Sequence, residues 1–324
     1  MKLPFQKSVQ DTDTAVRFRP SPAVLPLVCA VLLLFARLFK DTFFRGDGVY
    51  LTVVIFQIII FLIPSGVWIH SRGEGYLSRL RLIPGKPETL LLTVSASLLL
   101  ITGGLSLSIL FSGIQNIAGT FTLYDSFLSE ESGGVSAPFL YAVLAYAALP
   151  AICEELLFRG ILSAEYDRHG CAISVLAGTL FFACVHFQFG GLPVYLFSGI
   201  VLSMTAYLTR SVWGAVLAHF LYNLFGLFGQ PYIRAFYEIT GSSELFIFLL
   251  VSILLLSLAV FCGETARLLR LYSARNYKEI PIPRTKDGSK VPFRIRAKYV
   301  LLKPEAILLY ILWIAASILF LFIS

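Results

Sequence analysis

The stretch Leu149–Arg159, LPAICEELLFR, places two adjacent glutamates and an arginine inside an apolar segment that is long enough to span a bilayer. A charged side chain near the middle of a membrane helix costs about 2.5 to 3.5 kcal/mol on insertion scales. Such groups are retained mainly where they pair with one another or take part in chemistry. Glu154 and Glu155 are therefore the first candidates for a functional site within the membrane.

On a helix, Glu155 and Arg159 share a face, with the acid on the N-terminal side, which is the favourable order for an ion pair. Glu154 is turned by about 100° and points elsewhere. Because Pro150 cannot donate a backbone hydrogen bond, a kink is expected just before the two glutamates. Glu155 and Arg159 can be a purely structural pair, but a second acid beside a satisfied pair has no structural need.

Two of the four histidines, His186 and His219, also lie inside apolar runs. Phe182 comes four residues before His186 and Asn223 four residues after His219, so each pair is expected on one helix face. A lone membrane histidine or asparagine is more often a hydrogen bond between helices than a catalyst. Because three separate runs place polar groups in hydrocarbon, we expect these groups to face one another across a shared cavity.

The composition is that of a polytopic membrane protein, since 57% of the 324 residues are hydrophobic and only 14% are charged. Apolar runs near the spanning length of about 20 residues predict an all-α fold of about nine transmembrane helices, with a core helical bundle that holds an intramembrane site. The runs are 23–39, 49–69, 89–111, 138–162, 172–189, 192–209, 211–229, 244–262 and 305–323.

These runs divide the chain into four expected parts. Residues 1–22 form a polar N-terminus. Residues 23–137 hold the first helices and an extracytoplasmic loop with an interfacial piece at 114–128. The buried polar groups lie in 138–229, and 230–324 hold the last helices and a basic loop at 264–304. In this loop, the turn signal Asp287-Gly288 and the alternating run 291–295 suggest a small β-hairpin.

Loop charges predict the orientation of the chain. Lys and Arg occur in the N-terminus and in 70–88, 163–171 and 264–304, whereas 112–137 has acids but neither Lys nor Arg. The positive-inside rule then makes the N-terminus cytoplasmic and the C-terminus external, although Lys40 and Arg45 fall on the outer side. The first twenty residues have no apolar core, so no cleavable signal peptide is expected.

The basic 264–304 loop accounts for the formal net charge of +7, because it has eleven Lys and Arg against three acids. A basic loop beside membrane helices indicates contact with anionic lipid headgroups rather than with nucleic acid. The five cysteines are scattered and form no C-x-x-C pair. Neither a disulfide framework nor a thiolate zinc site is expected.

A carboxylate, two imidazoles and an amide together favour one class of reaction. The carboxylate can act as a general base on water, and an imidazole can share that water or protonate a leaving amine. An imidazole N–H and an asparagine amide can stabilise an oxyanion. This set suits hydrolysis of an amide bond within the membrane.

The same residues resemble the motifs of the CPBP family of intramembrane glutamic endopeptidases, which includes the CAAX prenyl proteases and Abi-type bacteriocin-processing relatives. Each motif is weak alone, and their specificity comes from their joint order on apolar runs. The resemblance covers roughly 138–229, a CPBP-like catalytic core. It rests on Glu154-Glu155-x-x-x-Arg159, Phe182-x-x-x-His186 and His219-x-x-x-Asn223.

The resemblance implies that Glu154 activates the attacking water with help from His186. It implies that His219 and Asn223 form the oxyanion hole. Neither a metal nor another cofactor is expected, the substrate is a protein or peptide, prenylated or not, and a bacterial cell membrane is the expected location. Three supporting residues would shape the site: Glu155, Arg159 and Phe182.

Two other functions stay open from the sequence. Glu154, His186 and His219 are a plausible zinc ligand set, although no H-E-x-x-H motif is present. A transporter or membrane scaffold can use buried acids to relay protons or bind a substrate, but no inverted repeat is evident. Serine and aspartic intramembrane proteases fit poorly, because the apolar runs contain no aspartate pair.

The depths of the site residues conflict if the helices are straight and upright. At about 1.5 Å per residue, Glu154 lies about 12 to 14 Å and His219 about 12 Å from the cytoplasmic ends of their predicted spans, whereas His186 lies about 21 Å from the end of its own. Tilt, a kink at Pro150, or a 163–171 turn that dips into the membrane would each bring them together.

Overall fold

A computed structural model describes residues 20–39, 42, 49–113, 139–275, 282–285 and 287–323. Every predicted apolar run forms helix, so the all-α fold is confirmed for this part of the chain. The first half contains α1 (Val24–Leu38), α3 (Val49–Gln57), η2 (Ile58–Leu62), α4 (Ile63–Arg72), η3 (Tyr76–Leu80), η4 (Pro87–Thr89) and α5 (Leu90–Ser112). The predicted interfacial piece at 114–128 lies outside the described residues.

The segment with the two glutamates is one unbroken helical stretch from Phe139 to His169. Its pieces are α7 (Phe139–Ala142), η6 (Val143–Ala148), α8 (Leu149–Glu155), η7 (Leu156–Leu162), α9 (Ser163–Tyr166) and η8 (Asp167–His169). It is followed by α10 (Cys171–Cys184), α11 (Leu192–Thr209), α12 (Val212–Phe228), α13 (Gln230–Thr240), α14 (Ser243–Ala274), α15 (Phe293–Leu301) and α16 (Pro304–Ile323).

The chain is a multi-pass membrane protein with six helices in the described part that are long and apolar enough to cross a bilayer, or seven if α12 and α13 form one bent span. The predicted number of nine is not confirmed. Two of the nine runs, α1 and α10, give helices of only 15 and 14 residues. At 1.5 Å per residue each is about 21 to 23 Å long, short of a hydrocarbon core about 30 Å thick.

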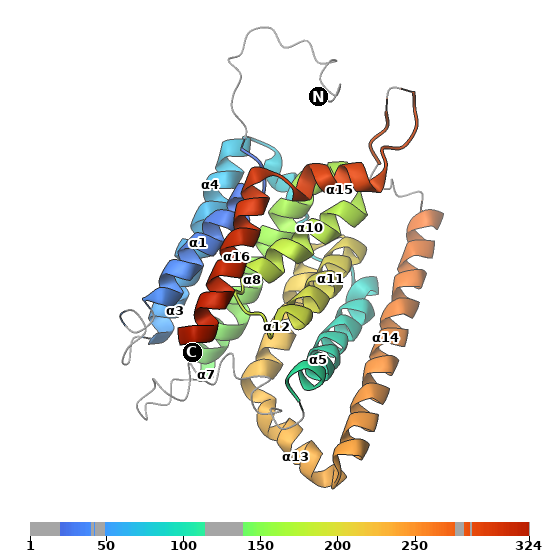
Figure 1. Cartoon of the computed structure of the whole chain (residues 1–324). Coiled ribbons are helices and arrows are strands. Elements are labelled where there is room, and N and C mark those ends of the chain that lie inside the picture. The colour runs from blue at the N-terminus through green and yellow to red at the C-terminus, as the bar shows by residue number, and fades with distance from the viewer. Residues whose placement is uncertain are drawn as a thin grey trace.

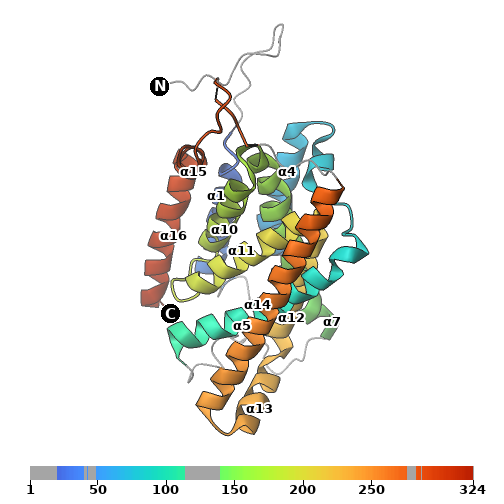
Figure 2. The same ribbon diagram turned by 90° about the vertical axis from the view of Figure 1, so that its right-hand side faces the viewer.

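The helices pack as a bundle in which the segments around the glutamates occupy the middle (Figure 1). α1 and α16 pack together on one side, and α5 and α14 pack together on the other. α5 also contacts α11 and α12. The turned view shows α5 near these two helices (Figure 2). The site helices are therefore enclosed by N-terminal and C-terminal segments, which are far apart in the sequence.

Two expectations for the basic 264–304 segment are wrong. α14 continues to Ala274 instead of ending near 262, because its last turns stay amphipathic: Leu268 is fully buried and Glu264 pairs with Arg267. The alternating run at 291–295 forms the start of α15 rather than a hairpin strand. Only an isolated antiparallel bridge between Arg284 and Lys290 flanks the turn.

α13 had no counterpart among the predicted elements. Its axis turns by 70° from that of α12, close to Gly229 and Pro231. The helix is short and contains Arg234 and Glu238, so it does not have the composition of a span. Its buried Ile233 joins Leu105, Phe246 and Leu250 in a small apolar cluster.

Gly199 lets α10 and α11 approach closely, as small residues do in membrane bundles. A Cβ at position 199 would lie 2.9 Å from Thr179 Cγ2 and 3.0 Å from its Cα, so backbone would have to move. We expect Gly199→Ala to lower the free energy of unfolding by about 1–3 kcal/mol through overpacking. Reversible unfolding of the detergent-purified protein in SDS would measure this.

Gly178→Ala is the matched control on the facing helix. Its Cβ would meet its nearest neighbours at 3.6 Å, an ordinary contact distance. This variant should stay within about 0.5 kcal/mol of the wild type or gain stability, because Ala is the better helix former. Equal losses in both variants would contradict the close approach at Gly199.

Candidate active site

Two π-helical segments flank the glutamates. η6 ends just before Leu149, whose N–H bonds to the carbonyl of Leu144, five residues back, and η7 begins at Leu156. Pro150 lies in the first turn of α8, between the two segments. π-helical turns are rare and occur frequently at functional sites. The irregularity expected at Pro150 is therefore a change in hydrogen-bond register within a continuous helix.

Glu155 and Arg159 form the ion pair that their spacing predicts, with Arg159 Nη1 2.8 Å from Glu155 Oε1. Both side chains are fully buried. The guanidinium also donates to α11, to the carbonyl oxygen of Gly199 at 3.1 Å and to Ser203 Oγ at 3.3 Å. Arg159 thus links the glutamate helix to α11. Its long side chain fits there because the α11 residues that it contacts, Gly199 and Ser203, are small.

His219 of α12 reaches the same carboxylate. Its Nδ1 lies 2.9 Å from Glu155 Oε1. The two residues are 64 positions apart in the chain and lie on different helices. An ionised carboxylate can accept hydrogen bonds but cannot donate them, so Nδ1 carries the proton. Nε2 remains available to another partner. Glu155 therefore receives two donors, one from its own helix and one from α12.

His186 lies just beyond the end of α10 and is partly exposed. Its Nδ1 is 2.7 Å from the carbonyl oxygen of Phe182, which makes Nδ1 the donor and leaves Nε2 as an acceptor. Its ring stacks on Tyr195 of α11, with the ring centroids 4.0 Å apart and the planes inclined by 23°. The next residue, buried Phe187, has a φ of 49°, a conformation that is uncommon outside glycine.

Phe182 lies between the two histidines. Its ring centroid is 4.7 Å from that of His186 and 6.1 Å from that of His219. The Arg159 guanidinium carbon lies 4.7 Å from the same ring, which is a cation–π distance. The three motifs are therefore brought together around one buried phenylalanine.

Glu154 differs from its neighbour in both exposure and partners. It is partly exposed, whereas Glu155 is fully buried. Its Oε2 atom is nevertheless buried and has no hydrogen-bond partner among the described residues. An unpaired buried oxygen of this kind is costly unless a donor such as water or a substrate group reaches it.

Asn223 lies one turn after His219 and is buried. Its amide nitrogen is 3.5 Å from the carbonyl oxygen of Ala147 in η6, which is too long for a strong hydrogen bond. The amide can therefore donate to another acceptor at little cost.

The length of the glutamate helix removes the conflict in depth between Glu154 and His186. The 163–171 turn was predicted to begin after Leu162, but α9 and η8 continue the helix to His169. Glu154 then lies about 22 Å from the end of its helix at His169, and His186 lies about 22 Å from the start of α10 at Cys171. Straight helices can therefore place the two residues at similar depth.

The sequence did not identify several residues that contact the site. They are Gly199, Ser203, Tyr195, Gln188 and Arg37. Gln188 accepts from the Tyr195 hydroxyl at 2.9 Å, and Arg37 donates to the carbonyl oxygen of His186 at 3.2 Å. None of them belongs to a spaced polar motif. Their roles come from inter-helix register, for which a single sequence gives no direct signal.

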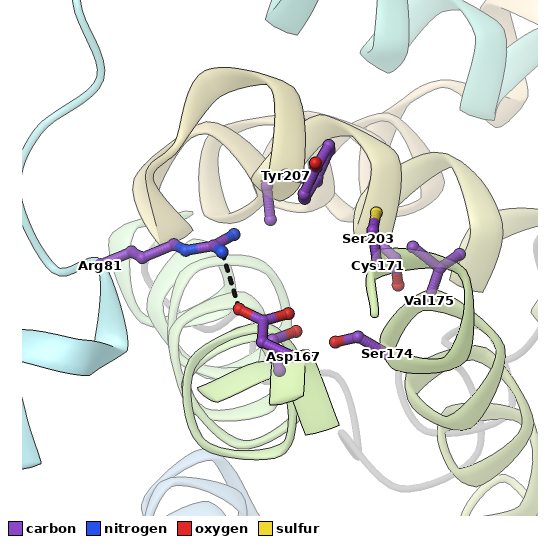
Figure 3. Close-up of a pocket in the computed structure, with 9 residues that line it drawn as sticks. Arg81, Asp167, Cys171, Ser174, Val175, Ser203 and Tyr207 are labelled. Carbon is purple, nitrogen blue, oxygen red and sulfur yellow. Dashed lines mark hydrogen bonds and ion pairs between the residues drawn. The ribbon is translucent and has the colours of Figure 1, made fainter. Parts of the chain in front are cut away.

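A small cavity beside Ser203 is too small to be the substrate site. It has a volume of about 10 Å³, enough for about one water. Figure 3 shows Ser203 and Ser174 on its wall and the ion pair between Arg81 and Asp167 at its edge, with 2.7 Å between Nη2 and Oδ2. This pair fixes the segment after α4 to the end of the glutamate helix.

The zinc interpretation requires three ligands around one point. The described residues contain no group of three or more His, Cys, Asp or Glu placed to hold one metal ion. In this structure the Nδ1 atom of His219 is engaged by Glu155, and that of His186 faces the Phe182 carbonyl oxygen. Each histidine thus offers only Nε2 to any further partner.

Comparison with known proteins identifies the same segment. Residues 136–225 match the family model described as Type II CAAX prenyl endopeptidase Rce1-like. This confirms the resemblance to the CAAX proteases and supports a CAAX-type intramembrane protease in general. No curated protein and no solved structure was found to match the chain.

Proposed function

We propose that this protein, whose residues 136–225 match the Rce1-like type II CAAX prenyl endopeptidases, is a metal-independent intramembrane glutamic endopeptidase. Its substrate is a protein that it cleaves near the C-terminus or in a membrane-embedded part. One observation carries the proposal: His219 binds Glu155 from another helix, next to a Glu154 oxygen that has no partner among the described residues.

In the proposed reaction, Glu154 is the general base. A water held by Glu154 Oε2 and His186 Nε2 gives a proton to the carboxylate as its oxygen attacks the scissile carbonyl carbon. The resulting oxyanion accepts hydrogen bonds from His219 and Asn223. Glu154 then passes the proton to the leaving nitrogen, the C–N bond breaks, and the products are a carboxylic acid and an amine.

This role sets a requirement on the charge of His219. Its Nδ1–H is engaged by Glu155, so Nε2 can donate to an oxyanion only when the ring is protonated. Glu154, Glu155, Arg159 and His219 then form a neutral set of two acids and two bases. Glu155 acts as a positioning residue that holds the imidazole through Nδ1.

The test is a cleavage assay on the purified wild type with matched prenylated and unprenylated peptides, in the presence of a metal chelator. Turnover that survives the chelator supports the metal-independent mechanism, and the preferred peptide defines the substrate class. Stoichiometric zinc that is needed for turnover would overturn it. Proton-coupled uptake in vesicles without any peptidase activity would favour the transporter alternative.

Orientation completes the proposal. The basic N-terminal segment and the basic 264–304 segment predict a cytoplasmic N-terminus in a bacterial cell by the positive-inside rule, and the 264–304 segment then faces anionic headgroups of the inner leaflet. Protease protection of tagged termini in sealed vesicles would test this. Accessibility of an N-terminal tag from the outside of intact cells would contradict it.

Tyr195 is expected to position His186 through ring stacking. We expect Tyr195→Leu to lower kcat about tenfold, because the stacking of an aromatic pair contributes about 0.5–1.5 kcal/mol and its loss lets the imidazole leave the water site. Tyr195→Phe keeps the ring and removes the hydroxyl, which donates to Gln188, so it should retain most activity. Michaelis–Menten analysis should show the loss in kcat rather than in KM, and equal losses in both variants would contradict the stacking role.

A further inference from the structure

A second cavity lies at one end of the bundle, away from the glutamates. Its volume is about 430 Å³, within the range of small-ligand sites. Three candidate spans have an end on its wall: Arg72 ends the first, His169 ends the glutamate helix, and Pro304 begins the last. α15, which leads into α16, crosses this end of the bundle (Figure 1). A cavity where spans end lies at the depth of the lipid headgroups.

Positive charge predominates on the wall of this cavity. Four cationic side chains face two carboxylates there. The cations are Arg72, Arg79, Arg168 and Lys303, and the acids are Glu165 and Glu305. The net charge of the lining is therefore positive, which favours an anionic group.

Glu165 is already satisfied by the protein. It accepts from the Tyr76 hydroxyl at 2.9 Å and lies 3.0 Å from Arg72 Nε. Burial raises the pKa of the Tyr76 hydroxyl, and the adjacent Glu165 carboxylate raises it further, so Tyr76 remains a neutral donor. Arg72 and Glu165, which both line the cavity, thus neutralise each other.

The remaining cations have no carboxylate within ion-pair distance among the described residues. Arg79 donates to the carbonyl oxygen of Ala164 at 2.6 Å, and Lys303 lies over the ring of Tyr299 at 4.3 Å. Arg168 is exposed at the cavity. Together these three side chains can hold one phosphate by charge-assisted hydrogen bonds.

Two buried polar atoms on the same wall point to a ligand. Tyr166 is only 3% exposed, and its hydroxyl has no hydrogen-bond partner among the described residues. Glu305 Oε2 is also buried and unpartnered there. The hydroxyl can donate to a phosphate oxygen, whereas the carboxylate oxygen needs a donor. The complementary ligand therefore has a phosphate and, beside it, an ammonium or hydroxyl group.

We infer that this cavity binds the headgroup of a phospholipid that has a phosphodiester and a hydrogen-bond donor, as in phosphatidylethanolamine or phosphatidylglycerol. The phosphate lies among Arg79, Arg168 and Lys303, and the headgroup donor reaches Glu305. The acyl chains run along α1 and α16, whose outward faces include Val28, Val31 and Ile311. Phosphatidylcholine has no such donor and leaves Glu305 Oε2 unsatisfied.

The test compares two double variants of the full-length protein in detergent. Arg168→Gln with Lys303→Gln removes two cavity cations, and Arg294→Gln with Lys298→Gln removes two exposed cations of α15 that do not line the cavity. Native mass spectrometry and thermal shift would measure the binding of added phosphatidylglycerol, phosphatidylethanolamine, phosphatidylcholine and free glycerol phosphate.

We expect the cavity variant to bind phosphatidylglycerol and phosphatidylethanolamine at least tenfold more weakly, and the α15 variant to bind them as the wild type does. Glu305→Gln should reduce the preference over phosphatidylcholine. The inference would be overturned if both double variants bound these lipids equally weakly, or if the wild-type protein bound phosphatidylcholine as tightly as it binds phosphatidylglycerol and phosphatidylethanolamine. Tight binding of glycerol phosphate alone would identify a soluble phosphate ester as the ligand and would overturn the lipid assignment.

Discussion

Glu154→Gln should abolish turnover, with a loss of at least about a hundredfold in kcat. General-base catalysis contributes about 10²- to 10⁴-fold, and an amide cannot accept the proton of the attacking water. The substitution keeps the shape of the side chain and removes a charge whose Oε2 has no partner among the described residues. Folding should therefore be preserved, as size-exclusion chromatography and circular dichroism of the purified variant would show.

Glu238→Gln is the matched control for this variant. Glu238 lies on α13, outside the three motifs, and is exposed. Its neutral variant should cleave the same peptide at the wild-type rate. If Glu154→Gln also retained wild-type turnover, the glutamate mechanism would be wrong, and the transporter or scaffold interpretation would gain weight.

The sequence predicts the local parts of the site well, because each motif fits within one or two helical turns. The spacing of Glu155 and Arg159 implies their ion pair, and the spacing of Phe182 and His186 implies their contact. These relations depend only on the 3.6-residue period of a helix. The length of the apolar runs, near that of a membrane span, separately predicts that each forms a helix.

Relations between helices were harder to predict. The family resemblance implies an oxyanion hole of His219 and Asn223, whereas the structure also places His219 Nδ1 on Glu155, 64 residues away. The stacking of Tyr195 on His186 similarly depends on how α11 returns beside α10 after the strained Phe187. A single sequence contains no periodic pattern that predicts how neighbouring helices align with each other.

The ends of helices were the other source of error. Charged residues after an apolar run predict loops at 163–171 and 264–304, yet the helices continue to His169 and to Ala274. In each case the charges are paired: Asp167 pairs with Arg81 of another segment, and Glu264 pairs with Arg267, three residues further along the same helix. The boundary of hydrocarbon and the end of a helix are separate properties, and hydropathy reports only the first.

The largest effect on stability is expected at Arg159. Arg159→Leu leaves the fully buried Glu155 with His219 as its only hydrogen-bond donor in the described part of the chain, and α11 loses the donor to Gly199. Removal of one partner from a buried ion pair costs about 3–5 kcal/mol, because the remaining charge stays desolvated. SDS unfolding of the purified variant would measure the loss.

Two further variants separate the charge from the loss of packing. Arg159→Leu combined with Glu155→Leu removes both charges, so the double variant should recover part of the stability lost in Arg159→Leu. Arg81→Leu breaks a pair whose side chains are 26% and 21% exposed, and it should cost less than about 1 kcal/mol. If the double variant were no more stable than Arg159→Leu, the contacts of the guanidinium with α11, rather than its charge, would hold the site together.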